Sequence, residues 1–126
     1  MDDPCGPIEH FEWGQFRILG KTHSEEGKGV GKDIFLMNGH VQAWSARKGH
    51  RLTTGMVAVV FDRGISTLVI GNGVRGRVKV PGRTQRAIHQ MGIENLIIQP
   101  TPEACMTYNE LYRSGAAVAL LAHGTC

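Results

Sequence analysis

The sequence predicts an α/β fold in a single domain that spans residues 1–126. The first third of the chain alternates apolar and polar residues as β-strands do, and the remainder alternates apolar runs with helical spacing. Strand, helix, strand, helix, strand in that order is typical of crossover connections, which make neighbouring strands parallel. A length of 126 residues and a hydrophobic content of 41% fit one globular domain with its own core.

The first third is predicted to form strands over Gln15–Leu19, Asp33–Met37 and Val41–Ser45. Asn38-Gly39 separates the last two, and this dipeptide favours a type I′ turn because both residues tolerate a positive φ. A β-hairpin is therefore predicted there. The connection His23–Lys32 is rich in glycine and charge, which predicts an exposed and mobile loop.

The next segment, Met56–Asp62, is ambiguous. Its valines favour a strand, yet Thr53 or Thr54 would suit a helix N-cap and Gly64 would suit a helix end. Local sequence alone leaves both alternatives open. The continuous apolar run Ile65–Ile70 ends at a glycine and predicts a buried strand.

Two helices and two strands are predicted beyond the glycine-rich loop. Helical spacing appears around Ala87–Met91, and Asn95–Gln99 is predicted to be a strand. Thr101 is the predicted N-cap of the next helix, with Pro102 in its first turn and Ser114-Gly115 at its end. The last predicted strand is Ala116–Ala122. The residues expected on the inward stripe of the second helix are Cys105, Tyr108, Leu111 and Tyr112.

Composition excludes several classes of protein. The longest apolar run, Ala116–Ala122, is far shorter than the ~18 to 20 residues of a spanning helix, so no membrane insertion is expected. The acidic start Met1–Pro4 lacks the features of a secretory signal, which predicts a cytoplasmic location. Cys5, Cys105 and Cys126 are odd in number and are expected to be free thiols. The oligomeric state and the protein partner stay unknown.

The positive charge is unevenly placed, although the formal net charge is only +3. Clustered cations attract phosphate or nucleic acid. Aromatic residues make up only 6% of the chain and offer no stacking platforms, so nucleic acid is not expected as a partner. A solvated face is the simpler interpretation. Six cations lie between the acids Asp62 and Glu94, and these are Arg63, Arg75, Arg77, Lys79, Arg83 and Arg86.

A candidate site follows from the predicted topology. If the last three strands are parallel, one sheet edge collects the loop 71–76, the helix start at Thr101 and the segment His123–Cys126. Open α/β sheets bind ligands at this edge. The candidate ligand-binding residues are Gly71, Asn72, Gly73, Arg75, Gly76, Arg77, Lys79, Thr101, His123 and Cys126.

The loop 71–76 matches the pattern G-x-G-x-x-G, in which small residues let backbone amides approach a phosphate. A dinucleotide site also needs a helix inside the motif, whereas Val78–Pro81 intervenes here. The next strand ends at Gln99 rather than at an acid that would bind ribose. No cofactor is therefore expected, and the loop is predicted to be either a structural turn or a site for a small anion beside Arg75 and Arg77.

His123 and Cys126 raise the hypothesis of thiol or metal chemistry. One such pair falls short of the three or four protein ligands that zinc normally takes, so no metal site is expected. A cysteine nucleophile also needs a base, and that base needs an orienting group, for which Asn109 and Glu110 are uncertain candidates. Enzyme activity is not expected, and no catalytic residue is assigned.

Five motifs resemble, in order and spacing, the adipogenesis-associated Mth-domain family over nearly the whole chain. The resemblance implies a three-layer α/β/α sandwich with a central mixed sheet and makes Met56–Asp62 a helix. An N-terminal β-hairpin region is predicted to precede this sandwich. The resemblance also implies that one strand runs antiparallel. The motifs are Phe11-Glu12-Trp13-Gly14, Leu68-Val69-Ile70-Gly71-Asn72-Gly73, Val78-Lys79-Val80-Pro81, Glu103-Ala104-Cys105 with Tyr108-Asn109-Glu110-Leu111, and His123-Gly124-Thr125-Cys126.

The resemblance implies no catalytic residues, substrate or cofactor, but the family includes an assembly factor for mitochondrial respiratory complex I. Two functional hypotheses follow. The first and favoured one is a binding or assembly module that recognises another protein through its surface. The alternative is an enzyme or sensor for a small, phosphate-bearing anion at the loop 71–76.

Overall fold

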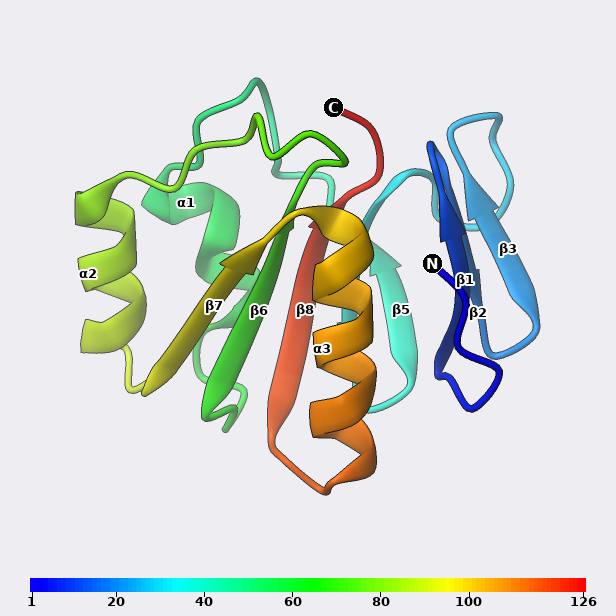
Figure 1. Cartoon of the computed structure of the whole chain (residues 1–126). Coiled ribbons are helices and arrows are strands. Elements are labelled where there is room, and N and C mark those ends of the chain that lie inside the picture. The colour runs from blue at the N-terminus through cyan, green and yellow to red at the C-terminus, as the bar shows by residue number, and fades with distance from the viewer.

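A five-stranded mixed sheet lies at the centre of the protein, and a separate three-stranded antiparallel sheet precedes it (Figure 1). The computed structural model describes all residues, 1–126. The strand order in the central sheet is β5-β4-β8-β6-β7. The strands are β1 (Ile8–Glu12), β2 (Gln15–Ile18), β3 (Lys21–Ser24), β4 (Asp33–Met37), β5 (His40–Ala43), β6 (Thr67–Asn72), β7 (Asn95–Gln99) and β8 (Val118–His123).

Helices cover both faces of the central sheet (Figure 1). On one face lie α1 (Thr54–Val57), a following 3₁₀ turn η1 (Ala58–Val60), and α2 (Gly82–Gln90). On the other face lie α3 (Thr101–Arg113) and the N-terminal sheet, which share one apolar core. This arrangement confirms the α/β fold with a central mixed sheet. No helix has both the length and the apolar character that crossing a bilayer requires.

The three crossover strands are parallel, as the sequence predicted. β6 pairs in parallel with β7 and with β8, whereas β4 runs antiparallel to β8 and to β5. The predicted turn at Asn38-Gly39 is confirmed, with φ values of 51° and 76°. This hairpin belongs to the central sheet, because Ile34, Phe35 and Leu36 are buried and β4 lies between β5 and β8. The antiparallel strands β1, β2 and β3 form the N-terminal β-hairpin region that precedes the central sheet.

The N-terminal region differs from the prediction. It forms three strands, of which only β2 was predicted. The segment His23–Lys32 is not a loop throughout, because His23 and Ser24 end β3 and are buried. Four-residue strands carry too little alternation for a sequence pattern to separate them from a polar loop.

Three details of the helices also differ. The helical segment after Thr53 ends at Val60, and Thr53 forms no capping bond through its side chain. Pro100 rather than Thr101 is the N-cap of α3. Tyr112 does not face inward, because its side chain is 36% exposed at the edge of the helix face that holds the buried Tyr108.

Asn109 on α3 joins that helix to the N-terminal sheet. Its amide nitrogen donates to the carbonyl of Ile8 at 2.8 Å and to Oδ2 of Asp3 at 3.0 Å, and its oxygen accepts from the N–H of Ile8 at 3.0 Å. Arg113 also donates to Asp3, and this hydrogen bond lowers the pKa of the Asp3 carboxyl. The fully buried Asn109 therefore provides hydrogen-bond partners for both backbone groups of the buried Ile8 in β1.

The buried His23 predicts a stability change with pH. Its Nδ1 accepts from the N–H of Val30 at 3.0 Å, and burial lowers the pKa of the imidazole. The unfolded chain therefore binds a proton below pH ~6.5 while the folded protein resists it, so stability falls as pH falls. The free energy of unfolding of His23→Asn should therefore fall less between neutral and acidic pH than that of the wild type. The Asn oxygen replaces Nδ1 as the acceptor and does not titrate.

Urea denaturation at about pH 7.5 and about pH 5.5 measures this difference. His10→Asn is the control, and its effect on the pH dependence of stability should have the opposite sign. The hydrogen bond with Asp2 raises the pKa of His10, whereas burial lowers that of His23. Removing His10 removes a stabilisation that is present at low pH. Equal pH dependence of the wild type and His23→Asn would contradict the prediction.

Candidate functional site

The carboxyl ends of β6, β7 and β8 meet at one edge, and Thr101 connects the segments there. Its hydroxyl donates to the carbonyl of His123 at 2.7 Å and accepts from the N–H of Gly73 at 3.0 Å. Its own N–H donates to the carbonyl of Gly73 at 3.0 Å. The structure thus brings together Gly73, Thr101 and His123 at the sheet edge that the sequence identified.

The glycine loop contacts the last residues of the chain. A Cβ on Gly73 would lie 2.3 Å from the backbone carbon and oxygen of Cys126. Most backbone amides of the loop donate within the protein, so they do not form an open cradle for an anion. In and directly after the loop, the backbone N–H of Val74 donates to the carbonyl of Thr125, that of Gly76 to Gly73, that of Arg77 to Cys126 and that of Val78 to Asn72.

The remaining candidates of the loop contact different segments. Gly71 lies against Thr101, where a Cβ would be 3.0 Å from the hydroxyl oxygen. The guanidinium of Arg75 lies 5.7 Å from the ring centre of Trp13. Lys79 pairs through its backbone with the segment 50–52. The side-chain oxygen of Asn72 is buried without a hydrogen-bond partner.

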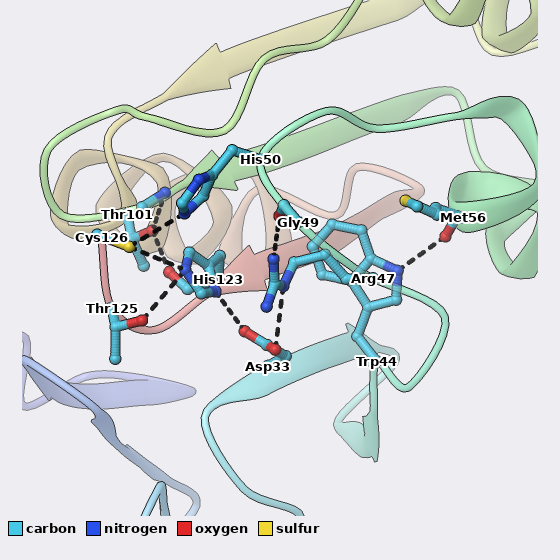
Figure 2. A network of polar contacts seen from close by, with 11 residues as sticks. Asp33, Trp44, Arg47, Gly49, His50, Met56, Thr101, His123, Thr125 and Cys126 are labelled. Atoms are coloured by element: carbon cyan, nitrogen blue, oxygen red, sulfur yellow. Dashed lines mark hydrogen bonds and ion pairs between the residues drawn. The ribbon is translucent and has the colours of Figure 1, made fainter.

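The sulfur of Cys126 lies beside two imidazoles, those of His50 and His123, as Figure 2 shows. Its Sγ is 3.3 Å from Nε2 of His50 and 3.9 Å from Nε2 of His123. One ligand atom from each of the three residues falls within a distance of 4.8 Å. Sequence reasoning missed His50, because it lies in a basic loop that is far from the other two residues along the chain and has no motif spacing to them.

Asp33 orients His123. Its Oδ1 is 2.6 Å from Nδ1 of His123, because the antiparallel register of β4 and β8 places these two residues opposite each other. Burial alone would raise the pKa of the Asp33 carboxyl. The hydrogen bond with His123 and the positive charge of Arg47 outweigh burial and lower this pKa. Asp33 is therefore an ionised carboxylate that supplies the orienting group for which the sequence had no clear candidate.

The same carboxylate anchors the loop that carries His50. Nε of Arg47 donates to Oδ2 of Asp33 at 3.0 Å, and Nη1 of Arg47 donates to the carbonyl of Gly49 (Figure 2). The N–H of Lys79 donates to the carbonyl of His50 at 2.7 Å. One network thus holds His123 directly and His50 through its loop.

The network assigns roles to the two nitrogens of His123. An ionised Asp33 accepts only, so Nδ1 of His123 is the donor in this contact, which leaves Nε2 as the nitrogen that can offer a lone pair. Nε2 lies 3.1 Å from the hydroxyl of Thr125 and faces Cys126. The site therefore presents two imidazole nitrogens and one sulfur, a set of donors suited to a borderline-soft metal ion or to thiol chemistry.

Solved structures share this fold. A conserved hypothetical protein of Pyrococcus horikoshii OT3 superposes with a TM-score of 0.76 at 19% identity, covering 94% of this chain and 98% of that one. A protein described as an outer membrane protein of Bartonella henselae gives 0.74 at 21% identity, with 95% of each chain covered. A Mth938-like domain of Bordetella pertussis gives 0.63 at 19% identity, covering 98% and 90%.

The family of proteins of unknown function DUF498/DUF598 matches residues 8–123. The match includes Asp33, His50 and His123, whereas Cys126 lies beyond it. Together with the Mth938-like structural neighbour, it confirms the resemblance to Mth-domain proteins that the five motifs indicated. This chain belongs to the DUF498/DUF598 family.

Proposed function

We propose that this protein binds a divalent transition metal ion, with Zn²⁺ as the best fit, through His50, His123 and Cys126. The observation that carries the proposal is the placement of three ligand atoms within 4.8 Å. Zinc takes imidazole nitrogen and cysteine sulfur at about 2.0 to 2.3 Å, so tetrahedral ligands lie roughly 3.5 Å apart. The sulfur-to-nitrogen distances of 3.3 and 3.9 Å bracket that value.

The contacts around the ligands also support metal binding. Histidine ligands usually donate their second N–H to a carboxylate, which fixes the ring and raises its basicity. Asp33 makes this contact with His123 at 2.6 Å. The expectation of no metal site rested on the pair of His123 and Cys126 alone, and His50 supplies a third ligand. Three protein ligands leave a fourth position for water or another molecule.

A covalent enzyme is less well supported than a metal site. The two cavities of the structure, of about 420 and 250 Å³, are lined by residues other than Cys126, His50 and His123. A cysteine hydrolase would need a substrate pocket beside its thiol. Metal binding needs only the ligand cluster and an entry path, and His50 is exposed.

Titration of reduced, metal-free protein with Zn²⁺ against a chromophoric chelator tests the proposal. We expect one ion per chain, and substitution with Co²⁺ should give the charge-transfer absorption of a thiolate ligand. Cys126→Ser should abolish this absorption, and Asp33→Asn should weaken binding about tenfold to hundredfold. Zn²⁺ should also slow the labelling of Cys126 by a thiol reagent, which without metal should exceed that of the buried Cys105.

Cys5→Ser is the matched control, because Cys5 is exposed and belongs to no cluster of ligands. This variant should bind Zn²⁺ as the wild type does. Unchanged affinity in Cys126→Ser, or the absence of binding at one ion per chain, would refute the proposed site. Slow labelling of Cys126 without metal would mean that the thiol is inaccessible.

A protein-binding or assembly role is the second candidate, and exposed apolar side chains favour it. Leu19 is 59% exposed and Tyr112 is 36% exposed. Their side chains converge over Gly39: a Cβ added there would lie 3.7 Å from Cδ1 of Leu19 and 3.8 Å from the hydroxyl oxygen of Tyr112. Complementation of a deletion strain separates the two candidates. Loss of function in Leu19→Ser with normal function in Cys126→Ser would favour the protein-binding role.

A further inference from the structure

A cavity of about 420 Å³ lies between the β5–α1 loop and the start of α2, and none of the three proposed metal ligands lines it. Its volume falls within the range of small-molecule sites, roughly 300 to 1,000 Å³. Leu52 is its only hydrophobic lining residue. The other lining residues are Arg51, Thr53, Thr54, Gly55, Pro81, Arg83 and Thr84.

The charge around this cavity has one sign. Arg51 and Arg83 take part in no ion pair, whereas Arg47 and Arg113 are both paired with carboxylates. No Asp or Glu lines the cavity. Between Asp33 and Glu94 the only acid in the sequence is Asp62, so both walls come from segments nearly free of acid. Two guanidinium groups without counterions favour an anionic occupant.

The walls of the cavity are fixed by hydrogen bonds. The fully buried Thr84 donates its hydroxyl to the carbonyl of Leu52 at 2.8 Å, and the N–H of Leu52 donates to the carbonyl of Lys79 at 2.9 Å. These bonds join α2 to the loop that carries Arg51. The two arginines are therefore mounted on walls that are already held in place, which reduces the entropy lost on binding.

The start of α2 adds to the attraction. Pro81, Arg83 and Thr84 belong to the N-cap and first turn of this nine-residue helix and line the cavity. Amides of a first turn have no acceptor within their helix, and here no side chain caps them and no acid lies in the first turn. Nη1 of Arg86 lies 3.3 Å from the Cβ position of Gly82, which places a third cation beside the same turn.

We infer that this cavity binds a small phosphorylated molecule with a polar body. Two guanidinium groups without counterions and the amides of a first helical turn suit a phosphate group. The exposed hydroxyls of Thr53 and Thr54 suit a hydroxylated body better than an aromatic one. The anion site is thus proposed at this cavity rather than at the loop 71–76, and it does not depend on metal binding.

Titration of the ¹⁵N-labelled full chain tests the inference, with inorganic phosphate and glycerol 3-phosphate as probes at constant ionic strength. We expect saturable shifts of the amide signals of residues 51–55 and 82–84, with tighter binding of glycerol 3-phosphate. Arg51→Gln and Arg83→Gln should each weaken binding by at least about tenfold. Both side chains are exposed, so the variants should keep the melting temperature of the wild type.

Arg77→Gln is the matched control, because Arg77 directly follows the loop 71–76 and does not line the cavity. It should bind both probes as the wild type does. Loss of binding in Arg77→Gln, equal shifts with chloride, or no saturable shift would overturn the inference. Tighter binding of a single-stranded oligonucleotide than of glycerol 3-phosphate would overturn the small-molecule assignment.

Discussion

Asn109→Ala should lower the free energy of unfolding by about 3 kcal/mol or more, because it leaves two buried backbone groups unpaired. The N–H and the carbonyl of Ile8 both bond to the Asn109 side chain, and Ile8 and Asn109 are fully buried. A buried donor or acceptor that loses its partner costs about 1 to 3 kcal/mol. The variant also removes one of the hydrogen bonds that hold Asp3.

Asn109→Asp separates the hydrogen bonds from the volume of the side chain. The carboxylate is nearly isosteric, but it would place an acceptor against the carbonyl of Ile8 and a negative charge against Asp3. We expect a loss of stability at least as large as that of Asn109→Ala. Asn95→Ala is the control, because Asn95 is exposed and its contact with Thr67 is a weak 3.4 Å. Urea denaturation measures all three, and a loss near that of Asn95→Ala would contradict the prediction.

Gly73→Ala should both destabilise the protein and impair the proposed metal site. Gly73 has a φ of 101°, which strains any other residue, and its new Cβ would lie 2.3 Å from the backbone of Cys126. The backbone of Cys126 is also held by the N–H of Arg77. The clash must displace the segment that carries the sulfur ligand, so affinity for Zn²⁺ should fall by at least about tenfold.

Gly92→Ala isolates the backbone strain from the clash. Gly92 has a φ of 90°, and a Cβ there would meet no atom within 4 Å. This variant should lose only the roughly 1 to 2 kcal/mol expected for a positive φ and should bind Zn²⁺ normally. Gly73→Ala should lose at least about 2 kcal/mol more. Equal stability of the two variants would mean that Cys126 moves away freely.

Several elements could be predicted because their signals are local. Asn38-Gly39 specifies its hairpin through the φ values that the turn requires, and the run Ile65–Ile70 identifies β6 through continuous apolar character. The order of strands and helices then predicts that β6, β7 and β8 are parallel, because a helical crossover returns the chain in the same direction. The spacing of apolar residues along α3 likewise predicts that Cys105 and Tyr108 face the core, where the structure has them.

The sequence by itself thus determined the alternation of strands and helices and the meeting of Gly73, Thr101 and His123 at one sheet edge. Only the tertiary structure decided which side chains surround Cys126. Asp33 meets His123 across 90 residues of sequence and His50 meets Cys126 across 76. These contacts depend on the antiparallel insertion of β4 beside β8 and on the path of a loop held by Arg47 and Lys79. Neither leaves a periodic signal in the chain, because the partners of a strand are chosen by the packing of whole layers rather than by local spacing.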